Sequence, residues 1–308
     1  MSTAEPRDTH DQTVPAIAWR AKFGTSCLRL FFRLAEHAPR ALDALRPLLC
    51  WMTFHASRQI KHATRTNARH LLGIDSTARQ RDKLGVGVVN QFYQFCCDVG
   101  QSSSASPAEL VERIATVRGD AQYRQARARK RGVILITAHL GSFEVGMAAL
   151  RRIEPEIHVV FRRDAVGQFE QRRSRLRARL GIHEAAIDDG WSVWVRLRNA
   201  LMENHAVILQ ADRVMPGQKG QPTPFFDGHL ELPLGPVKLA LASGSPIVPV
   251  FAVRRADGRI DLHVERAIEV VDVDSALGEI AAVLEKYIRA YPQQWLMLQP
   301  AWCEDQGK

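Results

Sequence analysis

The chain has 308 residues, 46% of them hydrophobic, which is enough to bury a full core in one large domain or two smaller ones. Its 42 Lys and Arg residues outnumber 33 Asp and Glu residues, and the net charge of +9 predicts a polyanionic partner such as nucleic acid, anionic lipid, a phosphorylated substrate or an acidic protein. The five cysteines are scattered and lack CxxC spacing, which argues against a disulfide framework or a zinc site and favours a reducing cytosol.

The N-terminal part of the chain is expected to be helical after a short tail. Residues 1–15 are polar and acidic, which is typical of a disordered tail and not of a signal peptide. Apolar residues and arginines recur at roughly helical spacing over residues 16–60, and residues 76–130 are also expected to be helical. We therefore predict an N-terminal helical region over residues 16–130.

Residues 16–60 allow two interpretations. They could form a pair of helices packed on the core, which is the common use of amphipathic helices in globular proteins. Alternatively, they could lie on a membrane, with the arginines among lipid phosphates. The apolar anchors would then be Phe31, Phe32, Trp51 and Phe54. Arginines and prolines interrupt the longest apolar runs before the about 18 residues that a spanning helix requires, so we expect no transmembrane helix.

Short apolar runs alternate with helical segments from residue 131 to residue 308. Strands are predicted at 133–137, 157–161, 205–210, 246–253 and 260–270. Helices are predicted between or after them at 142–153, 168–181, 191–204, 235–244 and 274–291. This alternation predicts an α/β core over residues 131–308, with a mostly parallel central sheet flanked by helices.

A histidine and a glutamate follow the first of these strands, in the segment ILITAHLGSFEVG. His139 falls two residues beyond the strand, and Gly141 and Ser142 are suited to a sharp turn and a helix N-cap. His139 should therefore lie at the carboxyl edge of the sheet, where open α/β folds bind ligands, and Glu144 could reach back to it. A carboxylate that accepts the Nδ1 proton leaves Nε2 free to take a proton from a substrate hydroxyl. A purely structural pair is the alternative.

Other catalytic signatures do not occur in the sequence. There is no GxSxG elbow of a serine hydrolase, no HExxH zinc motif and no GxxxxGK[ST] phosphate loop. None of the cysteines has a recognisable catalytic setting. The histidine and the glutamate thus remain the main candidates for chemistry.

The segment GVILITAHLGSFE resembles the His-x4-Asp/Glu block of the lysophospholipid acyltransferase superfamily, and specifically the lipid A biosynthesis (late, lauroyl or myristoyl) acyltransferases. Further similarity lies in VVFRR (159–163), LQADR (209–213), PFFDG (224–228), LPLGPVKLALASGSPIVPV (232–250) and YPQQWLM (291–297). These segments follow in the family's order and cover most of the chain from about residue 60 onward.

The resemblance implies an α/β fold like that of glycerol-3-phosphate acyltransferase, and acyl transfer without a metal or another cofactor. His139 would be the general base on the acceptor hydroxyl and Glu144 its partner. The donor would be an acyl thioester of acyl carrier protein or coenzyme A, and the acceptor a lipid A precursor or a related glycolipid. The enzyme would lie peripherally on the cytoplasmic face of the bacterial inner membrane, against its anionic surface.

The resemblance also implies a set of substrate-binding residues. They are Arg162, Arg163, Asp212, Arg213, Phe225, Phe226 and Gly228. The arginine pair after strand 157–161 could contact an acceptor phosphate or the oxyanion, or it could be a solvated strand end. The Asp-Arg pair could bind phosphate through the arginine or form a structural ion pair. The two phenylalanines and the glycine match a block usually written FFG, which Asp227 interrupts here.

The acceptor stays open at this point. Ser142 and Phe143 stand where lipid A enzymes often have Asn-Trp, so a lysophospholipid, an aminolipid or a polyene-type product is an alternative acceptor. The alternative from another class is a basic module that binds lipid or nucleic acid without catalysis. Basic residues are spread along the chain and no helix-turn-helix, RRM or zinc-finger pattern occurs, so we expect no nucleic-acid partner.

Overall fold

The computed structural model describes residues 22–163 and 166–306, and the expected disordered tail at residues 1–15 lies outside them. The helices are α1 (Lys22–His37), α2 (Pro39–Ala56), α3 (Arg58–Leu72), α4 (Ala78–Ser102), α5 (Pro107–Glu112), α6 (Asp120–Arg127), α7 (Phe143–Leu150), α8 (Gly167–Arg179), α9 (Trp191–Met202), α10 (Gly235–Ser243) and α11 (Val273–Ala290). Short 3-10 helices are η1 (Ile187–Asp189), η2 (Pro292–Gln294) and η3 (Cys303–Asp305). The strands are β1 (Ile114–Arg118), β2 (Val133–Thr137), β3 (Ile157–Phe161), β4 (His183–Ala186), β5 (Ala206–Gln210), β6 (Gly220–Phe225), β7 (Gly228–Pro233), β8 (Ile247–Arg254) and β9 (Ile260–Val264).

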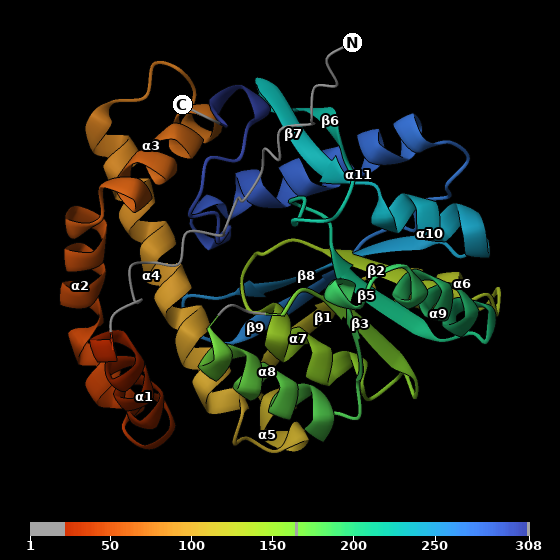
Figure 1. Ribbon diagram of the computed structural model, residues 1–308, viewed down its shortest axis with the longest axis horizontal. Helices are drawn as coiled ribbons and strands as arrows, with labels where there is room; N and C mark the ends of the chain where they lie inside the picture. Colours follow the sequence, from red (N-terminus) through yellow and green to blue (C-terminus); the bar gives the residue numbers. More distant parts are fainter. Residues whose placement is uncertain (1–21, 164–165, 307–308) are drawn as a thin grey trace, which may run out of the picture.

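A seven-stranded, mostly parallel sheet forms the centre of the protein, in the order β1-β9-β8-β2-β5-β3-β4. From β8 to β4 all neighbours are parallel, while β9 runs antiparallel to β8 and β1 runs parallel to β9. A separate β6-β7 hairpin lies beside the sheet (Figure 1). The predicted α/β class with a mostly parallel sheet is confirmed.

Strand β2 occupies the middle of the sheet because its sequence is apolar on both sides. All five residues of VILIT are buried, which is the pattern of a parallel strand covered by helices on both faces. Ile134 and Ile136 pack with α9, α10 and α11 in one core cluster. Val133 and Leu135 pack with α6, α7 and α8 in another. The sheet is therefore the middle layer of three.

Helices α1 to α4 form a further layer at one side of the sheet (Figure 1). The long helix α4 begins at a capping box in which Thr77 Oγ1 accepts from the backbone N–H of Gln80 and the Gln80 side chain accepts from the backbone N–H of Thr77. Phe32 of α1 packs against α4 and α8, and Phe54 of α2 packs against α3 and α4. The contact of Phe32 with α8 attaches the helical layer to the α/β core, and the contacts of Phe54 hold the layer together.

The structure divides the four apolar anchors that a membrane-bound segment would use. Phe32 and Phe54 are fully buried, and Phe31 is half-buried. Trp51 is exposed. Two of the four side chains thus belong to the core. No helix within the described ranges has the length and apolar character needed to cross a membrane.

Histidine 70 links the helical layer to the C-terminal segment. Its Nε2 lies 2.8 Å from Asp305 Oδ2, its Nδ1 contacts Asp227, and its ring stacks on Trp302 with centroids 4.2 Å apart. Asp227 is the residue that interrupts the FFG block, so the structure gives this extra carboxylate a partner on α3. The contact closes the α3 end of the helical layer against the β6-β7 hairpin.

Several elements differ from the sequence-based prediction. β1 lies within residues 76–130, where only helices are predicted, and it joins the sheet beside β9. β4, β6 and β7 are also absent from the predicted set of strands. β1 has the sequence IATVR and β4 the sequence HEAA, so neither has the long apolar run that marks a central strand. The pairing of β1 with β9 is also irregular between Ile114 and Thr116.

Candidate active site

The carboxyl edge of the central sheet brings a histidine and a carboxylate together. Strands β2 and β5 are parallel neighbours, and their register places Thr137 beside Gln210. His139 and Asp212 each lie two residues past these positions. They therefore leave the sheet side by side, at the edge where open α/β folds bind ligands.

Hydrogen bonds join His139, Asp212 and Trp295 in a line. His139 Nδ1 lies 2.8 Å from Asp212 Oδ1, and Asp212 Oδ2 accepts a hydrogen bond from Trp295 Nε1 at 2.9 Å. The Asp212 side chain is fully buried, whereas the His139 side chain is 21% exposed. The ring can thus reach a substrate while its partner is shielded from water. This is the arrangement of a general base and the carboxylate that orients it.

The charges around the pair define the proton positions. Burial raises the pKa of Asp212, but His139, Arg213 and the Trp295 N–H outweigh it, so the pKa lies below its usual range and the carboxylate is ionised. An ionised carboxylate only accepts, so His139 Nδ1 carries a proton. Burial also lowers the pKa of His139, the charges of Arg213 and Arg173 add to that effect, and Asp212 opposes them. A neutral ring with a free Nε2 lone pair follows.

The backbone after His139 is held by the segment that carries Trp295. The His139 carbonyl accepts from the backbone N–H of Leu296 at 2.7 Å, and the backbone N–H of Gly141 donates to the Gln294 carbonyl at 3.0 Å. Gly141 has a φ of +65°, and a Cβ there would lie 2.1 Å from the carbonyl oxygen of Ala252. Only glycine fits this turn.

Glu144 does not contact His139 in the way predicted from the sequence. It lies in the first turn of α7 and is buried, and its Oε1 accepts from Arg173 Nε of α8 at 2.5 Å. Its Oε2 is buried without a hydrogen-bond partner. The partner of His139 Nδ1 is Asp212, because β5 places that residue against the ring while α7 turns Glu144 toward α8.

Arg213 adds positive charge beside the pair. Its Nη2 lies 3.9 Å from Asp212 Oδ2 and donates to the Leu296 carbonyl at 3.1 Å. Its Nε is buried and has no hydrogen-bond partner. The guanidinium therefore has one N–H group without an acceptor, and an anionic oxygen of a bound substrate could accept a hydrogen bond from it.

The other predicted arginines are engaged elsewhere. Arg162 and Arg163 follow β3, which is separated from β2 by β5. Arg163 pairs with Asp189 at 2.7 Å, and Arg162 contacts Asp188 at 3.4 Å, both carboxylates belonging to η1. The structure thus gives both arginines carboxylate partners on η1.

Phe225 supports the site from behind, and its neighbours do not reach it. Phe225 is buried and packs against Trp295, with ring centroids 6.3 Å apart. Phe226 takes a left-handed backbone conformation at φ +53°, and its ring lies under Arg289. A Cβ at Gly228 would lie 2.8 Å from Trp302 Cδ1, so this glycine allows the hairpin to pack closely. Among these residues, only Phe225 touches the line of hydrogen bonds around Asp212.

A buried carboxylate fixes the start of α7 behind the site. Asp98 of α4 accepts from Ser142 Oγ at 2.6 Å and also pairs with Arg113 and Arg254. Burial raises the pKa of Asp98, but the two arginines outweigh it and the carboxyl stays ionised. Ser142 lies three residues after His139, so Asp98 holds the turn that positions the ring.

Asp98→Ala is expected to lower the free energy of unfolding by about 3–5 kcal/mol, because it leaves two arginines without their buried partner. Asp82→Ala in the same helix is the matched control. Its carboxylate pairs with Arg65 where both side chains are partly exposed, so we expect a loss of about 1 kcal/mol or less. Guanidinium unfolding curves of the two variants measure the difference, and equal losses would contradict a structural role for Asp98 at the site.

Three of these residues were absent from the sequence-based set. Trp295 lies in the segment YPQQWLM, whose similarity to the family does not mark it as a site residue. Arg173 lies in an arginine-rich helix that a solvated face would explain equally well. Asp98 carries no local signal, since its partners lie 15 to 156 residues away along the chain.

A small cavity lies next to the pair, between β2, β3, β5 and helices α7 and α8. It has a volume of about 40 Å³, and its walls are mostly apolar. Phe143, Glu144 and Arg173 belong to these walls, and the Phe143 ring meets the His139 ring edge to face at 5.9 Å. This space admits a few water molecules and not a fatty acyl chain.

The fold and the pair define an α/β protein with a histidine and a carboxylate at the ligand-binding edge of its sheet. The sequence profile of bacterial lipid A biosynthesis acyltransferases matches residues 19–304, and the chain belongs to this family. The family suggested by the sequence segments is thereby confirmed, and membership places the chain among the acyltransferases.

Two similar proteins are named phosphatidylinositol mannoside acyltransferases. The chain is similar to the phosphatidylinositol mannoside acyltransferase of Mycolicibacterium smegmatis, with 27% identity over 177 residues that cover 57% of this chain and 58% of the relative. It is also similar to the protein of that name in Mycobacterium tuberculosis strain H37Rv, with 24% identity over 250 residues that cover 78% of this chain and 77% of the relative. The chain thus spans somewhat over half of the first relative's length in that match.

Proposed function

We propose that this protein transfers a fatty acyl chain from a thioester donor to a hydroxyl of a glycolipid, with His139 as general base and Asp212 as the residue that orients it. The observation that carries the proposal is the line from Trp295 Nε1 through Asp212 to His139 Nδ1. It fixes the tautomer that leaves Nε2 free, and such a pair at the sheet edge suits proton removal from a hydroxyl.

The reaction follows from that protonation state. Nε2 removes the proton of the acceptor hydroxyl while its oxygen attacks the thioester carbonyl. The new oxygen–carbon bond forms, the carbon–sulfur bond breaks, and the imidazolium returns its proton to the leaving thiolate. Asp212 stabilises the positive charge that the ring carries between the two transfers.

Arg213 is the candidate for the negative charge that develops on the carbonyl oxygen or for an acceptor phosphate. Its unpartnered Nε and its position beside Asp212 support this role. A fixed cation in a site partly closed to water stabilises an oxyanion more than an exposed one does. Arg162 and Arg163 remain candidates for acceptor contact through their outer faces, although Asp188 and Asp189 already engage them.

The pH dependence of the reaction should show how burial and the nearby charges shift the pKa of His139. Burial and Arg213 lower the pKa of His139, and the base must be neutral, so the acid limb of kcat/KM should lie below the ordinary histidine value of about 6.5. Arg213→Gln removes a positive charge that disfavours the imidazolium. The pKa should rise, and the acid limb should move to higher pH. Arg163→Gln is the control, and an acid limb that Arg213→Gln leaves unmoved would contradict the proposed field.

The proposal names the chemical class of the donor and of the acceptor. Acyl carrier protein or coenzyme A would present the thioester, and the named relatives favour a glycolipid acceptor over a lysophospholipid, an aminolipid or a polyene-type product. A lipid A precursor and a mannosylated lipid both fit this class. Mass-spectrometric lipid profiles of bacterial cells that produce the wild type or His139→Ala at equal abundance test the proposal. A glycolipid that gains one acyl chain only with the wild type supports it, and identical profiles argue against it.

We also propose that α2 places the protein on an anionic membrane surface, on the cytoplasmic face of the inner membrane. Leu45, Leu48 and Met52 follow one another at helical spacing and are exposed, as is Trp51. Arg40 at the start of the helix is also exposed. Apolar side chains bordered by arginines suit the interface between lipid headgroups and acyl chains.

Trp51→Ser is expected to weaken binding to vesicles of phosphatidylglycerol and phosphatidylethanolamine by about tenfold, because a large aromatic side chain no longer enters the lipid. Co-sedimentation of the protein with the vesicles measures the binding. Trp191→Ser is the matched control. Trp191 is 79% exposed at the start of α9, on the far side of the sheet from α2 (Figure 1). Equal effects of the two changes would contradict membrane contact through α2.

A further inference from the structure

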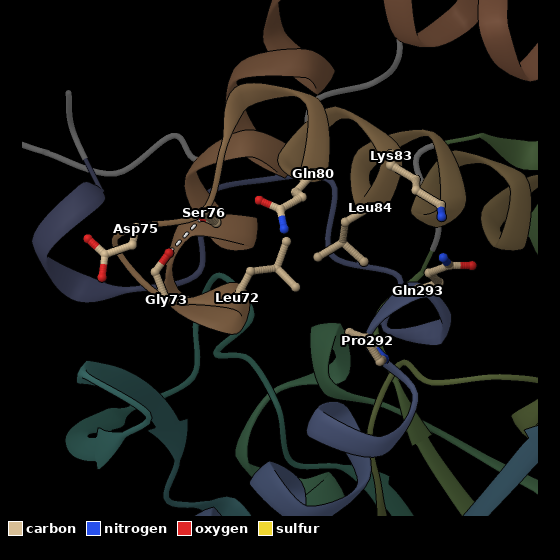
Figure 2. Close-up of a pocket in the computed structure, with 9 residues that line it drawn as sticks. All are labelled: Leu72, Gly73, Asp75, Ser76, Gln80, Lys83, Leu84, Pro292 and Gln293. Carbon is tan, nitrogen blue, oxygen red and sulfur yellow. Dashed lines mark hydrogen bonds between the residues drawn. The ribbon is translucent and has the colours of Figure 1, made fainter.

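A second cavity lies outside the His139 site. It has a volume of about 470 Å³ and lies between the turn that joins α3 to α4 and the short helix η2. Figure 2 shows Gln80, Lys83 and Leu84 on α4 facing Pro292 and Gln293 of η2. The volume falls within the about 300–1,000 Å³ typical of small-molecule sites.

Some polar side chains around this cavity are exposed to solvent and have no protein partner, whereas Ser76 Oγ donates to the Gly73 carbonyl at 2.6 Å. In the ranges that the structure describes, no hydrogen bond or ion pair involves the Lys83 amine, the Gln293 amide or the Asp75 carboxylate. Gln80 uses its Oε1 to accept from Thr77, which leaves its amide N–H groups available. The cavity therefore offers donors from Lys83, Gln80 and Gln293 and an acceptor from Asp75.

The mixture of groups selects among ligand classes. One cation and one carboxylate nearly cancel, which disfavours a phosphate, since phosphate sites gather several cations or backbone N–H groups. Leu72, Leu84 and Pro292 supply apolar surface between the polar groups. Sugar hydroxyls both donate and accept, and the C–H faces of sugar rings pack on such apolar side chains. A neutral carbohydrate matches this lining.

The cavity wall is continuous with the segment that holds the His139 site. Gln293 is three residues before Leu296, whose N–H bonds the His139 carbonyl, and three residues span at most about 11 Å. The two sites are thus neighbours that share no side chain. A lipid that carries more than one sugar could be acylated at His139 while another of its sugars occupies the cavity.

We propose that the cavity between α4 and η2 is a carbohydrate site that binds a sugar of the acceptor glycolipid other than the one acylated. The proposal rests on the proposed acyltransferase function for the identity of the ligand. Gly87 of α4 supports a built contact, since a Cβ there would lie 2.6 Å from Gln293 Cδ, so the helix lets this amide approach closely.

Saturation-transfer NMR with the purified full-length chain tests sugar binding directly. The probes are the methyl glycosides of mannose, glucose and N-acetylglucosamine, each in excess over a Kd of about 1 mM. We expect saturation transfer to at least one glycoside from the wild type and from His139→Ala. The double variant Lys83→Ala/Gln293→Ala should lose most of this signal. Lys238→Ala on α10 is the matched control and should retain it.

A kinetic arm links the cavity to the acceptor. Lys83→Ala/Gln293→Ala should raise KM for a glycolipid acceptor by about tenfold or more, the equivalent of losing about 1.4 kcal/mol of binding. The double variant should leave the rate of acyl transfer to a long-chain alcohol unchanged. The site is refuted if none of the three glycosides shows saturation transfer from the wild type. It is also refuted if the double variant binds the glycosides and acylates the glycolipid as the wild type does. If acylation survives His139→Ala, the assignment of His139 as the base fails, and if the wild type acylates no glycolipid, the proposed function fails; sugar binding in the cavity would stand by itself in either case.

Discussion

Replacing His139 with alanine should slow acyl transfer by about 10²- to 10⁴-fold, which is the range that general bases contribute. The reason is the geometry at the sheet edge, where Asp212 holds Nδ1 and leaves Nε2 as the one ring atom free to take a proton. Release of free thiol from an acyl thioester, measured with the acceptor at saturation, gives the rate.

The alanine variant also removes the partner of a buried carboxylate, which costs about 1–3 kcal/mol of stability. His139→Gln separates the two effects, because its amide can still donate to Asp212 but is not a base. We expect His139→Gln to unfold near the wild-type midpoint and to be as slow as His139→Ala. A glutamine variant that keeps more than about a tenth of the wild-type rate would rule out His139 as the base.

Asp212→Asn is expected to lower kcat by about 10²- to 10⁴-fold with a smaller change in KM. An asparagine can turn its NH₂ toward Nδ1, which moves the ring proton to Nε2 and abolishes the base. The volume of the side chain is conserved, and Trp295 Nε1 can still donate to the remaining oxygen. Steady-state kinetics with donor and acceptor varied in turn would measure both constants.

Glu144→Gln is the matched control for this change, since it also converts a buried carboxylate into an amide. Glu144 accepts from Arg173 and not from the imidazole, so its substitution should leave the ring tautomer intact. A smaller loss of kcat than in Asp212→Asn is expected. If Glu144→Gln costs as much as Asp212→Asn, the orienting role returns to Glu144, as the sequence spacing first indicated.

Much of the fold follows from local patterns in the sequence. The run VILIT predicts a central strand because four successive apolar residues suit a strand covered on both faces, and the structure buries all five residues of the run. The helices after it are also predicted, since their apolar residues recur with helical spacing. β1 escapes prediction because Ile114 to Arg118 has no fully buried residue and lies between helices.

The candidate site is predictable in its parts but not in its pairing. His139 and Asp212 can each be placed at the carboxyl edge, because both follow strands of a parallel sheet. Which carboxylate meets the ring depends on the neighbour of β2 and on the register of that pair, and neither is written in local sequence. The sequence therefore favours the nearer Glu144 over Asp212, which lies 73 residues from His139 along the chain.

Contacts between distant segments explain the rest. Asp98, Ser142 and Arg254 meet through the packing of α4 on the sheet, and no spacing rule connects them. Trp295 reaches Asp212 because the segment after η2 passes along the same edge. Such contacts become visible only once the layers are assembled.

The most direct test of acyl transfer at His139 is mass spectrometry of a glycolipid acceptor after incubation with the purified protein and an acyl thioester. Phosphatidylinositol mannoside and a lipid A precursor would be offered separately, with acyl carrier protein and coenzyme A thioesters as donors. The mass of one acceptor should increase by that of the donor's fatty acid less one water with the wild type, and stay unchanged with His139→Gln. An unchanged acceptor with the wild type in every combination, or an equal increase with His139→Gln, would contradict the proposed reaction.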